Sequence, residues 1–205
     1  MLSFPSQNWE KAITAATGNK APRNSGPGRL ASRITPRIFL SDYYTAHDTE
    51  KLTQHGITHV ISVIEPLPLL PDTIPKEKQL HIPIADASEA NILEHLDRTT
   101  EFIQSALDEN EHNKVLVHCM QGISRSATVV CAYLVATTAM TAPETIDHVR
   151  AIRGIVCPNL GFRKQLEQYA VKYVKLKPTP LPIASPSIKL SGGIAARIQR
   201  LRSGS

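Results

Sequence analysis

The chain has 205 residues but only three cysteines, and no two of them form a CxxC pair. Its eight histidines include no HExxH sequence. These absences remove the short spacings that are typical of zinc sites and of thioredoxin-like redox sites. We therefore expect no metal and no cofactor. Three scattered cysteines also favour a reducing compartment over a disulfide-bonded secreted fold.

Long hydrophobic runs are also missing. No stretch of 18 or more apolar residues occurs, and the N-terminus lacks a charged segment followed by an apolar one, so neither a transmembrane helix nor a secretory signal is predicted. The hydrophobic content of 41% is enough for one domain with a core. We expect a cytoplasmic or nuclear protein that is a monomer.

Acidic residues are absent from the C-terminal end. Residues 175–205 carry a net charge of +6, residues 1–34 carry +4 and residues 35–174 carry −5, which together give the formal total of +5. The sequence pI of 9.2 therefore comes from the two ends, and no stable nucleic-acid partner is expected. The basic stretch 194–202 is interpreted as a solvated tail, with contact to a membrane surface as the alternative.

Composition divides the chain into three parts. Residues 1–33 form a partly disordered N-terminal extension, because residues 18–28 are rich in Gly, Pro, Ser and Asn. Residues 34–176 form the main domain. Residues 177–205 form a tail rich in Pro, Ser and basic residues, and it begins with prolines that a helix cannot accommodate.

The most informative stretch runs from Val115 to Ser126 and reads VLVHCMQGISRS. Its first residues form an apolar strand, and an apolar helix begins at Ser126. The turn between them lies at a helix N-terminus, where unpaired N–H groups and the helix dipole attract anions. Such a position can lower the pKa of a cysteine from about 8.5 to about 3.5–7.5. The pattern predicts a phosphate held against a thiolate.

Each residue type in this turn suits that chemistry. Cys119 is the candidate nucleophile, and Arg125 offers a planar fork to two phosphate oxygens. Gly122 permits a tight bend, Ser126 places a hydroxyl near the sulfur, and His118 is expected to orient the loop through its ring nitrogens. The predicted phosphate-binding residues are Met120, Gln121, Gly122, Ile123, Ser124 and Arg125.

The spacing His118-Cys119-x5-Arg125-Ser126 resembles the signature of cysteine-dependent protein tyrosine phosphatases, and HCMQGISRSAT resembles their dual-specificity branch. The segments 34–40, 56–63, 149–153 and 158–166 are similar to other motifs of that branch, so the resemblance covers residues 34–174. The absence of a preceding kinase-docking domain makes the atypical group the best match. Ser41 departs from the pattern, because the branch usually has glycine there.

The leaving group of such a reaction needs an acid. The residues alone leave Asp72, Asp86 and Asp97 open as candidates. The resemblance favours Asp86, which follows the stretch Leu80–Ala85 and precedes a helix, and Glu89 is the reserve candidate. A loop between a strand and a helix can swing a carboxylate over a pocket.

The resemblance implies a phosphatase that hydrolyses phosphotyrosine and phosphoserine or phosphothreonine in proteins through a phosphocysteine intermediate, with a phosphorylated protein as partner. The same chemistry on RNA 5′-phosphate, phosphoglucan or phosphoinositide is an alternative, as are a non-catalytic phosphoprotein-binding module and a rhodanese-like sulfur carrier. The loop interior has no lysine, which disfavours an inositol lipid. Cys131 or Cys157 is a possible disulfide partner of an oxidised Cys119, as in some relatives.

Alternating patterns predict an α/β fold with a mostly parallel central sheet of four to five strands flanked by helices, as in phosphatases of dual-specificity size. The expected strands cover residues 37–40, 58–64, 79–84 and 114–118. The expected helices cover residues 45–55, 92–111, 126–138, 142–153 and 160–174.

Overall fold

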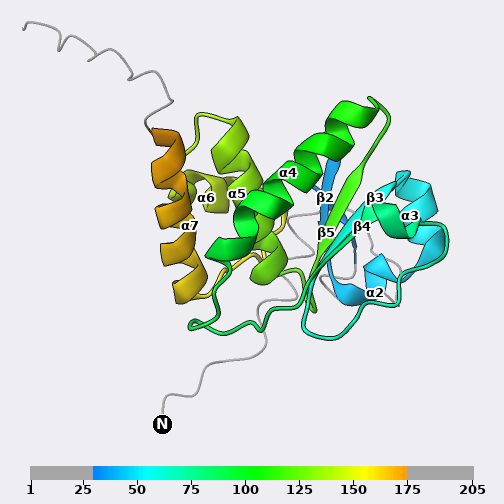
Figure 1. Ribbon diagram of the computed structural model, residues 1–205, viewed down its shortest axis with the longest axis horizontal. Helices are drawn as coiled ribbons and strands as arrows, with labels where there is room; N and C mark the ends of the chain where they lie inside the picture. The colour runs from blue at the N-terminus through cyan, green and yellow to red at the C-terminus, as the bar shows by residue number, and fades with distance from the viewer. Residues whose placement is uncertain (1–29, 175–205) are drawn as a thin grey trace, which may run out of the picture.

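The structure is a computed structural model that describes residues 30–174. Within that range, one sheet is covered by helices on both faces (Figure 1). The predicted tail and nearly all of the predicted N-terminal extension lie outside the described residues, and the domain boundaries stay a prediction. Among the described residues, no helix is long and apolar enough to cross a membrane.

The central sheet has five strands in the order β1-β2-β5-β3-β4. The strands are β1 (Ser32–Arg33), β2 (Ile38–Ser41), β3 (His59–Val63), β4 (Gln79–Ile82) and β5 (Val115–His118). All neighbours pair in parallel except β1, which runs antiparallel to β2 at the edge. The predicted α/β class with a mostly parallel sheet is confirmed. Strand β1 was not predicted, because two residues are too few to show an alternating pattern.

The helices follow the predicted order with one exception. They are α2 (Tyr43–Ala46), α3 (Thr49–His55), α4 (Leu93–Glu109), α5 (Arg125–Thr137), α6 (Ala142–Ile152) and α7 (Leu160–Val174), with a 3₁₀ turn η1 (Lys76–Lys78). The single helix predicted over 45–55 is wrong, since it is divided into α2 and α3. Asp48 starts the second helix, because its carboxylate accepts the Lys51 N–H at 3.1 Å.

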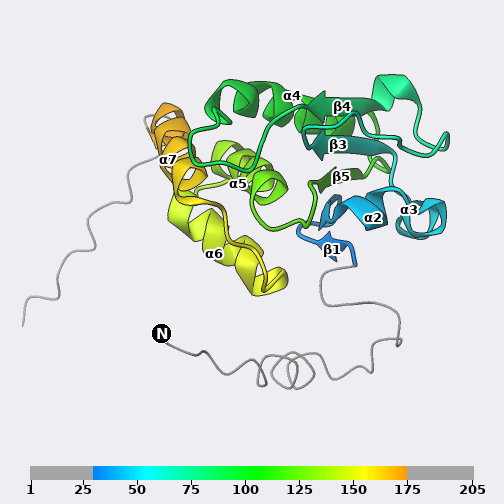
Figure 2. The same ribbon diagram turned by 90° about the horizontal axis from the view of Figure 1, so that it is seen from below.

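The two faces of the sheet are packed differently (Figures 1 and 2). Leu40, Ile61 and Val117 point to the face covered by α4, α5 and their neighbours, whereas Phe39 and Leu116 point to the face of α2 and α3. This division follows from the two-residue period of a strand. Helix α5 is buried along residues 125–135 and contacts α4, α6 and α7, as expected for a helix that is apolar on all sides.

The middle position of β5 decides where the loop after it emerges. His118, the last residue of β5, lies in register with Ser41 of β2 and Ser62 of β3. Because these strands are parallel, the loop leaves from the centre of their shared carboxyl edge, where ligands of open α/β sheets bind.

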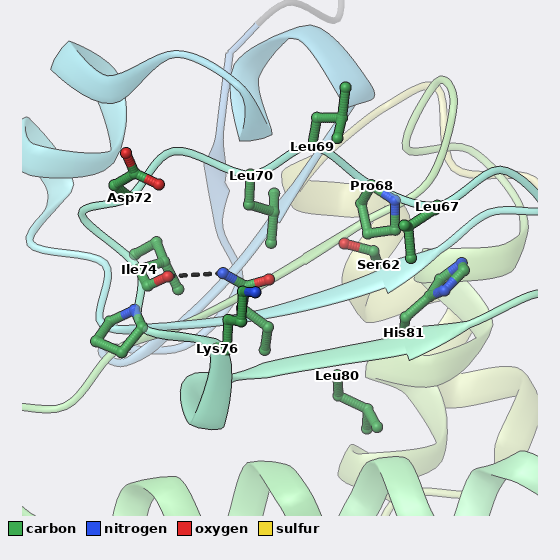
Figure 3. Close-up of a pocket in the computed structure, with 12 residues that line it drawn as sticks. Ser62, Leu67, Pro68, Leu69, Leu70, Asp72, Ile74, Lys76, Leu80 and His81 are labelled. Carbon is green, nitrogen blue, oxygen red and sulfur yellow. Dashed lines mark hydrogen bonds between the residues drawn. The ribbon is translucent and has the colours of Figure 1, made fainter.

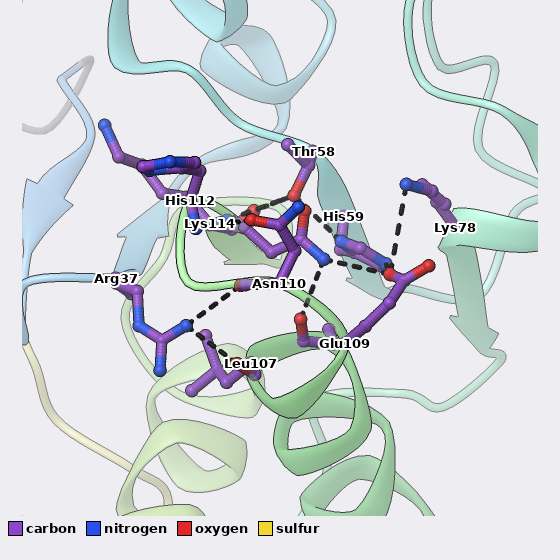
Figure 4. Close-up of polar contacts among 11 residues, drawn as sticks. Arg37, Thr58, His59, Lys78, Leu107, Glu109, Asn110, His112 and Lys114 are labelled. Carbon is purple, nitrogen blue, oxygen red and sulfur yellow. Dashed lines mark hydrogen bonds and ion pairs between the residues drawn. The ribbon is translucent and has the colours of Figure 1, made fainter.

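At the amino ends of the strands, opposite the loop, polar contacts join the sheet to the end of α4 (Figure 4). The Arg37 guanidinium donates to the carbonyls of Leu107 at 2.8 Å and Asn110 at 3.2 Å. The N–H of Lys114, just before β5, donates to the hydroxyl of Thr58, just before β3, at 3.0 Å. Charged and polar donors near a helix C-terminus satisfy its last carbonyls, so this edge serves stability.

Candidate functional site

The loop from Cys119 to Ser124 joins β5 to α5, and its carbonyl groups are held from outside by hydrogen bonds. The donor–acceptor pairs are Tyr43 N to Met120 O (3.2 Å), Arg153 Nη2 to Gln121 O (3.1 Å), Arg153 Nε to Gly122 O (3.0 Å), Cys157 N to Ile123 O (2.9 Å) and Thr128 N to Ser124 O (2.9 Å). Because the N–H of a trans peptide points opposite to its C=O, the amides of residues 121–125 face the interior of the loop. The loop is therefore a concave set of donors suited to an anion.

Gly122 is required at the bend. Its φ of +68° lies in the left-handed region, which side chains other than glycine rarely adopt. A Cβ at this position would lie 2.5 Å from the carbonyl oxygen of Ser41. Ser41, the position at which the sequence departs from the family pattern, therefore lies against the loop. The contact is made by its backbone carbonyl, which any residue at this position would supply.

Cys119 lies at the centre of the loop and is 2% exposed. Its Sγ accepts hydrogen bonds from the Ser126 hydroxyl at 3.1 Å and from the Gly122 amide at 3.3 Å. Burial raises the pKa of this thiol, but hydrogen bonds from the Ser126 side chain and from the loop amides outweigh burial, so the pKa of Cys119 is lowered overall. The site therefore stabilises the thiolate more than water stabilises that of a free cysteine.

His118 is buried below the nucleophile loop. Burial lowers the pKa of His118 to about 3, so its ring is neutral and has one N–H. Nδ1 lies 3.4 Å from the Cys119 carbonyl, which can only accept, and Nε2 lies 2.7 Å from the Ser62 hydroxyl. The assignment that satisfies both contacts places the proton on Nδ1 and makes Ser62 the donor to Nε2. Ser62 and the carbonyl of Cys119 thus hold the ring on two sides.

Arg125, the first residue of α5, is 8% exposed. Its Nη1 donates to the Ile84 carbonyl at 3.0 Å. Its Nε is buried and has no hydrogen-bond partner among the described residues, since the nearest carboxylate oxygen, Oδ2 of Asp86, lies 3.7 Å away. A buried donor without a partner is costly, which points to an anionic ligand at this atom.

Asp86 lies at the rim of the same loop, with 35% of its side chain exposed. Its Oδ1 accepts hydrogen bonds from the Ser124 hydroxyl at 2.7 Å and from the Asn159 amide at 2.9 Å. The structure thus brings Asp86 together with Cys119, Arg125 and Ser126.

The other acid candidates lie elsewhere. Asp97 belongs to α4 and forms an ion pair with Lys172. Asp72 lines a hollow of about 640 Å³ between the loop after β3 and the strands β3 and β4 (Figure 3). That hollow is lined mainly by leucine, isoleucine and proline side chains, so it does not suit a phosphate. Glu89 is exposed on the loop that carries Asp86, and none of the polar contacts found in residues 30–174 involves its side chain.

Three residues of the site were not assigned a role from the sequence. Arg153 holds two loop carbonyls, Asn159 contacts Asp86, and Ser62 contacts His118. Arg153 and Asn159 stand in segments that resemble the phosphatase branch, so motif similarity was a usable signal for them. Ser62 also stands in such a segment, residues 56–63, but its contact with His118 could not be foreseen, because only strand register brings the two together.

The cysteines are free thiols. Cys131 is buried in α5, and burial raises its pKa to about 12. Cys157 is exposed, and its Sγ accepts a hydrogen bond from Nη2 of Arg163 at 3.2 Å. A disulfide between either of them and Cys119 stays a prediction.

Comparison with known proteins agrees with this geometry. Residues 38–172 match the family model of the dual specificity phosphatase catalytic domain. The chain is 36% identical to dual specificity protein phosphatase 15 of Mus musculus over 143 residues, covering 69% of this chain and 58% of that protein. It is 34% identical over 143 residues to dual specificity protein phosphatase 22 of the same species, covering 69% and 74%.

A solved structure supports the same assignment. The crystal structure of DUSP15 superposes with a TM-score of 0.65 at 34% identity, covering 70% of this chain and 88% of that one. The family match covers most of the chain, and the fold, the loop and the relatives agree. The chain therefore belongs to the dual specificity phosphatase catalytic domain family.

Proposed function

We propose that this protein is a dual-specificity protein phosphatase that hydrolyses phosphotyrosine and phosphoserine or phosphothreonine through a phosphocysteine intermediate. One observation carries the proposal. The buried Nε of Arg125 lacks a hydrogen-bond partner among residues 30–174, with the Asp86 carboxylate 3.7 Å away, and it belongs to the same loop as a cysteine whose pKa is lowered by hydrogen bonds. A phosphate dianion would pair with the guanidinium and the inward amides while its phosphorus faces the sulfur.

In the first step, the Cys119 thiolate attacks phosphorus, so a P–S bond forms while the P–O bond to the substrate breaks. The departing oxygen takes a proton from the carboxyl group of Asp86, which becomes a carboxylate. Arg125 and the loop amides stabilise the charge on the three equatorial oxygens. The dephosphorylated side chain then leaves as a neutral hydroxyl group.

In the second step, the Asp86 carboxylate takes a proton from water as the water oxygen bonds to phosphorus. The P–S bond breaks, the electron pair returns to sulfur, and inorganic phosphate is released. Ser126 assists here, because its hydroxyl lies 3.1 Å from Sγ and donates to the thiolate that forms.

Two exposed apolar side chains support a protein substrate over one with several phosphates. Met120 follows the nucleophile and is 41% exposed, and Leu160 follows Asn159 at the rim and is 71% exposed. Apolar side chains at the mouth suit the neighbours of a phosphorylated residue in a polypeptide. Additional phosphates of an inositol lipid or an RNA 5′-triphosphate would instead need further cations.

The principal alternative from a different class is a phosphoprotein-binding module without turnover. A binding module needs the anion-binding loop. It has no use for a serine hydroxyl that is hydrogen-bonded to the cysteine sulfur or for a carboxyl group at the rim. The contacts of Ser126 with Cys119 and of Asp86 with Ser124 therefore favour catalysis. A rhodanese-like sulfur carrier likewise has no need of these two groups.

The test is turnover measured side by side on a phosphotyrosine peptide, a phosphothreonine peptide, RNA 5′-triphosphate and an inositol phospholipid. We expect phosphate release from both peptides and little from the other two. Cys119→Ser should abolish turnover and still bind the phosphotyrosine peptide, whereas Cys131→Ser, the same change at a buried cysteine of α5, should retain activity. Release of phosphate only from RNA or lipid would overturn the choice of substrate, and binding without turnover by the unmodified protein would favour the module.

A further inference from the structure

The loop that carries Asp86 is seated against the start of α7. This acid loop, residues 83–92, runs between β4 and α4 beside the N-terminal end of α7 (Figures 1 and 2). The Gln165 side chain accepts the Leu93 N–H and donates to the Ala90 carbonyl, both at 2.9 Å. A Cβ on Gly161 would lie 1.9 Å from the Ser88 carbonyl oxygen, so only glycine permits this close approach. The acid loop is therefore held in place by α7.

Asn159 lies where the acid loop, the phosphate loop and α7 meet. Its backbone N–H donates to the Ser124 hydroxyl at 3.1 Å. Its Oδ1 accepts the Phe162 N–H at 2.9 Å, as the cap of the first turn of α7. Because Oδ1 is thereby fixed as the acceptor, the amide orientation is determined and Nδ2 is the group that donates to Asp86 at 2.9 Å.

The Ser124 hydroxyl has a single hydrogen, and its direction is also determined. Its oxygen accepts the Asn159 N–H, so the hydrogen is available for Oδ1 of Asp86 at 2.7 Å. Oδ1 consequently receives two hydrogen bonds, one from each neighbour. A carboxyl oxygen that accepts two donors is the carbonyl-like oxygen of the acid, so the acid proton belongs on Oδ2. This is also the oxygen 3.7 Å from Nε of Arg125, on the side of the phosphate loop.

We propose that Asn159 is a positioning residue for the acid, which together with Ser124 directs the proton of Asp86 to Oδ2 and keeps that oxygen facing the leaving group. This inference rests on the proposed phosphatase function. The acid loop then needs no closing movement to become competent, because α7 already holds it at the site. The proton moves from Oδ2 to the departing oxygen, and the two hydrogen bonds at Oδ1 remain in both protonation states.

The test uses Asn159→Ser, because serine is also a good helix cap but is too short to replace the Nδ2 donor. Asn91→Ser is the matched control, since the Asn91 amide lies on the same loop but donates to Glu94. Turnover is measured on phenyl phosphate, whose leaving group needs protonation, and on p-nitrophenyl phosphate, whose leaving group needs it much less. We expect kcat of Asn159→Ser to fall about tenfold or more on phenyl phosphate, as a part of the factor of about 10²–10⁴ that acid catalysis contributes in total. On p-nitrophenyl phosphate we expect a loss of less than about threefold.

Binding should remain unchanged, because the phosphate loop is not altered. The KM for both esters and the inhibition constant for vanadate should stay within about twofold of the unmodified protein. In an Asp86→Ala background, Asn159→Ser should cause no further loss on phenyl phosphate, since a residue that acts through Asp86 is silent without it. Ser124→Ala should reproduce the same dependence on the leaving group, which provides a second variant if Asn159→Ser does not fold.

Equal losses on both esters, or a further loss in the Asp86→Ala background, would show a general structural role for Asn159 and overturn the inference. The proposed function would fail in a different way, through an unmodified protein that cleaves neither ester nor phosphopeptide. If Asp86→Ala depends on the leaving group while Asn159→Ser behaves like Asn91→Ser, the inference fails and the phosphatase function stands.

Discussion

Removal of the Ser126 hydroxyl tests the electrostatics of the nucleophile directly. Burial alone would raise the pKa of Cys119, and the net lowering comes from hydrogen bonds, of which that of the Ser126 side chain is the strongest. A hydrogen bond to a charged group is worth about 1.5–3 kcal/mol, and about 1.4 kcal/mol corresponds to a factor of ten. At a pH below the pKa of the thiol, Ser126→Ala should reduce the thiolate population about 10- to 100-fold.

The direction follows from which protonation state the hydroxyl stabilises. Ser126 donates to sulfur and so favours the thiolate, which means that its removal raises the pKa of Cys119. The thiolate then persists only at higher pH, and it is lost earlier as the pH falls. The reduction in thiolate population is therefore largest at acidic pH. It disappears once the pH exceeds the pKa of Cys119 in both the variant and the unmodified protein.

The assay is alkylation by iodoacetamide from pH 5 to pH 9, followed by mass spectrometry of the cysteine-containing peptides. The exposed Cys157 serves as an internal reference in the same sample, and the buried Cys131, with a pKa raised to about 12 by burial, should stay unmodified in the folded protein. As the pH is raised, the alkylation rate of Cys119 should begin to increase at a higher pH in Ser126→Ala than in the unmodified protein. Identical pH profiles would refute the assignment of Ser126 as the main stabilising group.

Three further outcomes are expected. Asp86→Asn should lower kcat on a phosphotyrosine peptide by about 10²–10⁴-fold and should lower kcat on p-nitrophenyl phosphate much less. Equal losses on the two substrates would show that another residue is the acid. Gly122→Ala should weaken vanadate inhibition about tenfold or more, because strain of about 1–3 kcal/mol joins the 2.5 Å approach to Ser41; an unchanged inhibition constant would contradict this. Ser62→Ala should lower the free energy of unfolding in urea by about 1–3 kcal/mol, since it leaves the buried Nε2 of His118 without its donor, and an unchanged midpoint would argue against that contact.

The prediction of the sheet succeeded where the sequence pattern is local. The strand Val115–His118 and the buried helix after it were recognisable because each is a continuous apolar segment. The helix expected over 45–55 was wrong, since Asp48 interrupts it by capping a new helix, and an aspartate inside a polar segment gives little warning of a break. The last helix, over 160–174, was predicted with its exact bounds, whereas several other elements began or ended one or two residues away from the prediction, because caps and turns decide such ends.

The residues of the site likewise divide into those that a local pattern predicts and those that only long-range contacts bring together. Cys119, Arg125 and Ser126 were predicted because the loop is short and contiguous, so their spacing alone brings them near one another. Asp86 was selected with the help of family resemblance, and its contact with Asn159 joins residues 73 positions apart. Such long-range contacts leave no periodic pattern in the chain, and the role of Asn159 therefore became visible only with the fold.

The order of amino acids by itself determined the anion-binding turn, since a strand, a glycine bend and a helix N-terminus must produce inward amides wherever that segment is placed. Tertiary structure decided how the turn is supported. Arg153 reaches back from the residue after α6 to bind the carbonyls of Gln121 and Gly122, and Ser62 reaches His118 through strand register. These partners come from distant segments, and only packing of the sheet and helices around one core brings them within hydrogen-bond distance.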